Sequence, residues 1–127
     1  MEKVLGFGGF FFRAADPAAL ARWYAECLGV DPVPGDYATP PWQQLEGPTV
    51  FAPFPQDSDY FGDPAKTWML NFRVRNLDAM VRQLRGHGVV VEVDPEIWPN
   101  GIFARFLDPE GNPVAIWEPQ VNPAPAP

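Results

Sequence analysis

Hydrophobic residues follow two spacings along the chain, and each spacing predicts one kind of element. Residues 5–13 and 68–75 are short apolar runs rich in aromatic and branched side chains, which is typical of β-strands. After each run the apolar residues recur every three or four positions, as the buried face of an α-helix requires. These residues are Leu20, Trp23, Tyr24, Cys27 and Leu28 in the first helix, and Leu77, Met80, Val81 and Leu84 in the second. The pattern therefore predicts a strand followed by an amphipathic helix, twice.

Capping residues indicate where the two helices begin and end. Asp16 and Asn76 stand just before the periodic segments, where a side-chain oxygen can accept hydrogen bonds from the free amides of the first turn. The proline after Asp16 suits the first helical position because it has no N–H group to leave unpaired. Glycine ends helices readily, and it follows the first helix at position 29 and the second at positions 86 and 88.

The two halves of the chain repeat one another. Residues 13–20 match residues 73–80 at an offset of sixty, and the flanking apolar residues agree as well. Further short strands are predicted after each helix, at 34–38, 42–46 and 49–54 in the first half and at 89–93, 101–107 and 113–118 in the second. Residues 108–112 carry the proline and glycine of a tight turn. The expected fold class is therefore α+β, with two βαβββ modules in tandem.

Length and composition favour a single domain. The chain has 127 residues, 46% of them hydrophobic, which suits one domain or two small halves that share a core. We expect one domain over residues 1–119, with module one at about 5–55, a connection at 56–67 and module two at about 68–118. The proline-rich residues 120–127 are expected to form a loose tail.

Charge and hydropathy exclude several classes of partner. The net charge is −7 and the pI is about 4.5, so nucleic acid and anionic membrane surfaces are not expected partners, because both need a basic face. No apolar run is long enough to span a membrane, and no signal-peptide pattern is present. Cys27 and His87 are the only cysteine and histidine, which excludes a Cys/His zinc site within one chain. We expect a cytoplasmic protein, with Cys27 in the core and His87 exposed at a helix end.

Three segments resemble the vicinal oxygen chelate superfamily, which comprises glyoxalases, bleomycin resistance proteins and extradiol dioxygenases. They are Phe-Phe-Arg-Ala-Ala-Asp-Pro at 11–17, Ala-Arg-Trp-Tyr-Ala-Glu-Cys-Leu-Gly-Val at 21–30 and Asp-Pro-Glu-Gly-Asn-Pro-Val-Ala-Ile-Trp-Glu-Pro at 108–119. The resemblance covers about residues 5–119, and it implies two βαβββ modules whose curved mixed sheets form a cup-shaped cavity. It also implies a homodimer, since two chains often complete the cavity in this superfamily.

The enzymes of this superfamily bind a divalent metal ion through His, Glu or Gln side chains on the first and last strands of each module. Carried onto this chain, those positions fall on Gly9, Met69, Ala115 and one residue within 49–54. None of them carries such a side chain, and a thioether is a poor ligand for hard divalent ions. We therefore expect no metal and no other cofactor.

Strand alternation then predicts which side chains line the cavity, because neighbouring residues of a strand point to opposite faces. The predicted ligand-binding residues are Phe11, Arg13, Trp42, Phe51, Met69, Asn71, Arg73, Phe103, Arg105 and Trp117. Trp68 and Trp98 are expected at the rim, and Phe10 and Phe12 beneath the helix. Arg13 and Arg73 lie at strand ends, where a solvated side chain or a structural ion pair is the usual outcome. If they point into the cavity instead, they need Glu46, Glu92, water or an anionic ligand as a partner. Residues 57–62 form a solvated loop or, alternatively, cap the cavity mouth.

Three functions are compatible with these features. The first is a metal-free protein that binds a small organic molecule in an aromatic cavity, as bleomycin resistance proteins do. The second is a glyoxalase-type metal-dependent lyase, isomerase or dioxygenase. A variant of this second function is a metal-free enzyme in which Glu46 or Glu92 acts as the base and Arg105 stabilises the developing charge. The third is a structural or partner-binding module whose cavity is filled by its own side chains. No catalytic residue is identified, and the sequence favours the first function.

Overall fold

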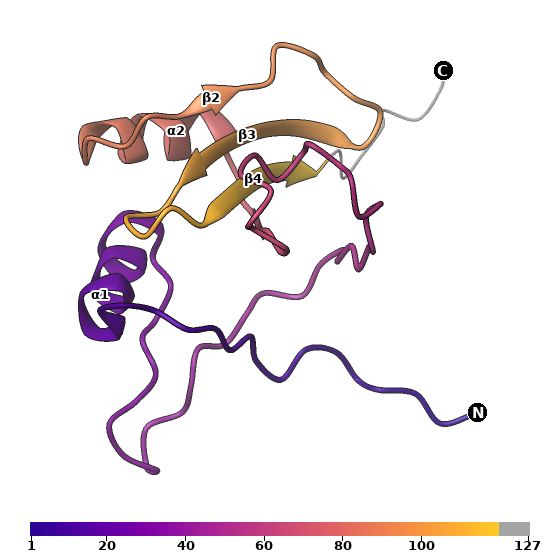
Figure 1. Cartoon of the computed structure of the whole chain (residues 1–127). Coiled ribbons are helices and arrows are strands. Elements are labelled where there is room, and N and C mark those ends of the chain that lie inside the picture. The colour runs from indigo at the N-terminus through magenta and orange to yellow at the C-terminus, as the bar shows by residue number, and fades with distance from the viewer. Residues whose placement is uncertain (120–127) are drawn as a thin grey trace, which may run out of the picture.

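The computed structural model describes residues 1–119 and contains one four-stranded sheet with two helices (Figure 1). The helices are α1 (Pro17–Leu28) and α2 (Leu77–Gly86), and the strands are β1 (Leu70–Arg73), β2 (Glu92–Val93), β3 (Gly101–Leu107) and β4 (Pro113–Pro119). The strand order is β1-β4-β3-β2, with β1 parallel to β4 and the other pairs antiparallel. The sheet is curved and does not close. The tail expected at 120–127 lies outside the described residues.

The second half of the chain forms the predicted βαβββ module, in the order β1, α2, β2, β3 and β4. The strands expected at 101–107 and 113–118 are found almost unchanged, whereas those expected at 68–75 and 89–93 are shorter. The α+β fold class is therefore confirmed. Within residues 1–119, neither helix is long and apolar enough to cross a membrane.

The first half of the chain contributes α1 but none of its predicted strands. Residues 5–13, 34–38, 42–46 and 49–54 contain no strand, and Figure 1 shows these stretches as irregular chain that forms no part of the sheet. A strand is stable only when a neighbouring strand accepts and donates its backbone hydrogen bonds, and these segments have no such neighbour within the described residues. Their side chains stay exposed as a result: Phe11 is 92% exposed and Phe51 81%. The prediction of four strands in the first half is wrong, and the division into two modules stays a prediction.

Both helices begin and end as the capping pattern predicts. The Oδ1 atom of Asp16 accepts a hydrogen bond from the Ala19 amide at 3.1 Å, and that of Asn76 accepts one from the Ala79 amide at 3.0 Å. Gly29 ends α1 in the left-handed conformation, at φ 71°, which glycine adopts without steric cost. His87 follows the last residue of α2 and is exposed, as expected.

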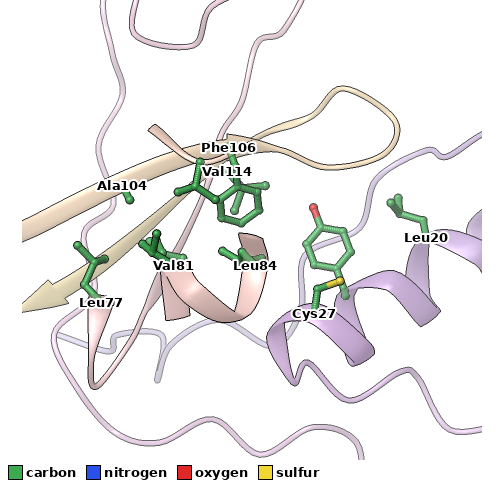
Figure 2. Packing of buried hydrophobic residues seen from close by; sticks show 11 residues of the cluster. Leu20, Cys27, Leu77, Val81, Leu84, Ala104, Phe106 and Val114 are labelled. Carbon is green, nitrogen blue, oxygen red and sulfur yellow. The ribbon is translucent and has the colours of Figure 1, made fainter. Parts of the chain in front are cut away.

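The apolar faces of both helices pack on one face of the sheet (Figure 2). Figure 2 shows the α2 side chains Leu77, Val81 and Leu84 directed at the strand residues above them. Val114 and Ile116 of β4 are fully buried in this cluster, which confirms the alternation expected for that strand. The buried Cys27 belongs to the same core, as predicted.

The turn at 108–112 joins the sheet to α1 through a buried polar network. The Oδ2 atom of Asp108 accepts hydrogen bonds from the Tyr24 hydroxyl at 2.6 Å and from the Asn112 side-chain amide at 2.8 Å. Its Oδ1 atom accepts from the backbone amides of Glu110 and Asn112. The Glu110 carboxylate in turn accepts from the amides of Ala15 and Asp16 just before α1. This network explains how two polar side chains of the turn, Asp108 and Asn112, can be buried.

Because of this network, the free energy of unfolding is expected to change with pH in the alkaline range. Burial, together with the hydrogen bond and the negative charge of Asp108, raises the pKa of Tyr24 well above its usual value of about 10. As pH rises above about 10, the unfolded chain loses the phenol proton and the folded protein keeps it, so the free energy of unfolding falls, with a limiting slope of about 1.4 kcal/mol per pH unit. In Tyr24→Phe this component of the slope is absent. Urea unfolding of both proteins between pH 8 and 11 measures it; parallel curves for the two would contradict the assignment.

Candidate functional site

The face of the sheet opposite the helices carries most of the polar and aromatic residues predicted for the cavity. We call it the open face and define it by Asn71, Arg73, Phe103, Arg105, Ala115 and Trp117, none of which belongs to the core between helices and sheet. The strand register arranges these residues in two rows. Arg73, Trp117 and Phe103 are paired across β1, β4 and β3. The next row contains Asn71, Ala115 and Arg105.

Phe103 and Trp117 form an aromatic pair on the open face, which we call the platform; Phe103 is half-buried and Trp117 is buried. Their rings are stacked with centroids 6.1 Å apart and an angle of 3° between the planes. The indole N–H of Trp117 donates a hydrogen bond to the Asn100 carbonyl at 2.9 Å, which fixes the orientation of the indole ring. The contact of Trp117 with Asn100 was not predicted. It is made by the backbone carbonyl of Asn100, which a residue of any type could supply.

Arg73 connects the platform to the irregular first half of the chain. Its Nη2 atom donates a hydrogen bond to the Leu45 carbonyl at 2.8 Å. Gly47 lies so close that a Cβ atom at this position would overlap the guanidinium, so the contact depends on a residue without a side chain. Neither Leu45 nor Gly47 was predicted, since the sequence carries no signal for a contact across such a long separation.

Arg105 is held by groups on both sides of it. Its Nη2 atom lies 3.6 Å from the Glu92 carboxylate, and its Nη1 atom donates a hydrogen bond to the Tyr60 carbonyl at 3.2 Å. The guanidinium also lies 5.1 Å from the centre of the Tyr60 ring. Glu92 is thus the partner of Arg105, whereas it was considered as a partner for the other arginines. Because both side chains of the ion pair are well exposed, the pair contributes little to stability.

An open hollow of about 2420 Å³ lies between the open face and the irregular segments. Most of the predicted binding residues border it, namely Phe11, Trp42, Phe51, Met69, Asn71, Arg73, Phe103 and Trp117. Arg13 borders a smaller cavity that adjoins the hollow, and Arg105 is turned toward Tyr60 and Glu92. That these residues bind a ligand stays a prediction.

The predicted positions of Phe10 and Phe12 are wrong, whereas Phe11 and Phe51 border the hollow in an unexpected setting. Phe11 and Phe51 border the hollow as exposed side chains, because the strands expected to present them are absent. Phe10 and Phe12 do not pack beneath α1 but against Trp68, with ring centroids 5.1 and 5.3 Å from it. The physical reason is the same for all of them, since alternation assigns faces only where a strand is paired.

The positions at which the resemblance implies metal ligands do not fit a divalent cation. Gly9 and Ala115 offer no side-chain donor, Met69 offers a thioether, and residues 49–54 contain no His, Glu or Gln. Ala115 is also in register with Arg105, whose positive charge disfavours a second cation nearby. Among residues 1–119, no group of three or more His, Cys, Asp and Glu side chains could hold a metal ion.

Comparison with known protein families identifies the chain. A family model described as a glyoxalase-like domain matches residues 9–117, which is most of the sequence. The chain belongs to the glyoxalase-like domain family. This confirms the resemblance to the vicinal oxygen chelate superfamily. No curated protein matches the chain.

Among the solved structures similar to this chain, TnmS3 shares its fold. TnmS3, an antibiotic binding protein from Streptomyces sp. CB03234, is 24% identical, with 84% of this chain and 88% of that chain covered and a TM-score of 0.51. A glyoxalase/bleomycin resistance protein from the same organism is 35% identical over 39% of this chain and 42% of its own, with a TM-score of 0.35. A Bacillus anthracis protein assigned to the glyoxalase family is 27% identical over 43% of this chain and 44% of its own, with a TM-score of 0.39. The chain thus matches less than half the length of the last two.

Proposed function

We propose that this glyoxalase-like protein binds a small, planar organic molecule on its open face without the help of a metal ion. The Phe103–Trp117 platform is the observation that carries the proposal. A fixed aromatic pair that borders a hollow suits a ligand with a conjugated ring system, because aromatic contacts add to the gain from apolar burial. Binding of this kind does not require metal-ligating side chains, which are missing at the positions where the resemblance implies metal ligands.

Polar groups at both ends of the platform row limit how a ligand can lie. Arg73 is paired with Trp117 on one side, and the Asp94 amide donates to the Phe103 carbonyl on the other. A ligand on the platform therefore meets the Arg73 guanidinium at one end, whereas Glu92 and Asp94 at the other end are already bonded to Arg105 and Trp98. This arrangement favours a molecule with a hydrogen-bond acceptor at one end of its ring system.

A homodimer and a cytoplasmic location remain part of the proposal. The outer edge of β1 has no neighbouring strand within the described residues, and the exposed Phe11 and Phe51 lie in segments of strand-forming composition. Exposed strand edges and apolar segments favour association with a second chain. The antibiotic binding of TnmS3 supports a small-molecule ligand for this chain as well.

Calorimetric titration with a panel of planar polycyclic antibiotics tests the proposal. At least one compound is expected to bind, and Phe103→Leu is expected to weaken its binding by about tenfold, because loss of an aromatic pair costs about 0.5–1.5 kcal/mol beyond the area change. Trp117→Leu is expected to weaken it further. Trp98→Phe, which alters a tryptophan that hydrogen-bonds Asp94 outside the platform, serves as the matched control.

Two results would count against the proposal. One is that no compound of the panel binds to the folded protein. The other is that a compound binds equally well to Phe103→Leu and to Trp98→Phe. Circular dichroism melting curves of each variant establish that it is folded before its affinity is compared.

A further inference from the structure

A second cavity, of about 390 Å³, lies beside the turn at 108–112 and apart from the platform. Its lining is Phe10, Phe11, Phe12, Arg13, Ala65, Lys66, Thr67, Trp68 and Asn112. None of the residues that define the open face borders it. Its volume is within the range of small-molecule sites, about 300–1,000 Å³, and it suits a ligand at the small end of that range.

Three aromatic rings form the apolar wall of this cavity. The ring centroids of Phe10 and Trp68 are 5.1 Å apart and those of Phe12 and Trp68 are 5.3 Å apart, both with steeply inclined planes. The Phe10 and Phe12 centroids are 5.4 Å apart. Each ring contacts the other two, so the wall is a continuous aromatic surface rather than a set of isolated side chains.

The polar side of the cavity carries two positive charges. Among residues 1–119, neither Arg13 nor Lys66 forms an ion pair. The Lys66 ammonium donates a hydrogen bond to the side-chain oxygen of the buried Asn112, at 3.3 Å, which holds it at the cavity. An ammonium has three donors and a guanidinium has five, so both retain donors for a ligand.

The carboxylates around this cavity are occupied elsewhere. Both oxygens of Glu110 accept backbone hydrogen bonds before α1, and Asp16 accepts one within α1. Asp108 accepts from Tyr24 and Asn112. Within residues 1–119, no carboxylate lines this cavity and neither cation is paired with one.

From this combination we infer that the cavity binds a small monocyclic aromatic carboxylate. The ring packs against Trp68 and the two phenylalanines, and the carboxylate lies between Arg13 and Lys66. A planar guanidinium accepts a carboxylate through two parallel hydrogen bonds, and each charge-assisted bond is stronger than a neutral one. This site adjoins the hollow, because Phe10, Phe11, Phe12, Lys66, Thr67 and Trp68 border both, but it does not include Phe103 or Trp117.

Titration with three probes tests the inference. Benzoate carries both the ring and the charge, benzamide the ring alone, and acetate the charge alone. Benzoate is expected to bind at least tenfold more tightly than either of the others, and its affinity is expected to fall with added salt. Equal affinities for benzoate and benzamide, or for benzoate and acetate, would overturn the inference.

Variants locate the binding site. Arg13→Gln and Lys66→Gln are each expected to weaken benzoate binding at least fivefold, whereas Arg82→Gln, on the exposed face of α2, is the matched control and leaves it unchanged. Phe103→Leu is also expected to leave benzoate binding unchanged, so that failure of this inference and failure of the platform proposal are distinguishable. Benzoate affinity that is the same in Arg13→Gln, Lys66→Gln and Arg82→Gln would overturn the inference, and circular dichroism establishes that the variants are folded.

Discussion

Replacement of Asp108 with alanine is expected to lower the free energy of unfolding by about 2–4 kcal/mol. The substitution removes the acceptor of the Tyr24 hydroxyl and of the Asn112 amide, and both donors are buried. A buried donor without a partner costs about 1–3 kcal/mol, because it has lost water and gained nothing in exchange. Urea unfolding at pH 7 measures the change, and an unaltered m-value shows that it reflects stability.

Asp36 provides a matched control for this substitution. Its Oδ1 atom also accepts two backbone hydrogen bonds, from Ala38 and Thr39, and these bonds hold the pKa of its carboxyl below the usual range. Asp36 is exposed, however, so water replaces the lost acceptor in Asp36→Ala, and we expect a much smaller change. Asp108→Asn, which keeps one acceptor oxygen, is expected to fall between the two. Equal effects of Asp108→Ala and Asp36→Ala would show that the buried network does not stabilise the fold.

Replacement of Leu84 with alanine is expected to destabilise the protein by about 2–5 kcal/mol. Leu84 is fully buried, and Figure 2 shows it on α2 beneath Phe106 and Val114. The loss has two parts, namely the apolar surface no longer removed from water and the cavity left under the sheet. Thermal and urea unfolding measure it.

Two further variants test whether the loss of stability comes from the burial of Leu84 or only from replacing a leucine. Leu107 is 61% exposed at the end of β3, so Leu107→Ala is expected to change stability by no more than about 0.5 kcal/mol. Leu84→Met, which nearly conserves the volume, is expected to cost less than about 1.5 kcal/mol. If Leu84→Ala were no more destabilising than Leu107→Ala, α2 would not be packed on the sheet as described.

The elements that were predicted correctly have their signals close together in the sequence. The Asp16 and Asn76 caps contact amides three residues away, within one turn of helix. Strands β3 and β4 are joined by the short turn at 108–112, so their pairing is also local. Alternation along a paired strand then placed Val114 and Ile116 in the core and Trp117 on the other face.

The elements that were predicted incorrectly depend on distant partners. Residues 5–13 have the composition of a strand, but composition does not specify which strand lies beside them. The same limit applies to the site, where the Phe103–Trp117 stack follows from strand register, whereas the contacts of Arg73 with Leu45 and of Arg105 with Tyr60 cross long separations. No local pattern encodes such contacts.

The amino-acid sequence by itself determined the two helices, the βαβββ order of the second half, the membership of the superfamily and the absence of metal-binding side chains at the implied positions. Only the tertiary structure decided that the first half forms no strand, that Arg13 joins Lys66 at the smaller cavity, and that Glu92 is the partner of Arg105. The physical reason is the sequence separation over which each kind of interaction acts. Helix caps, turns and alternation act over a few residues, whereas strand pairing and ion pairing depend on where the whole chain places groups that lie far apart in the sequence.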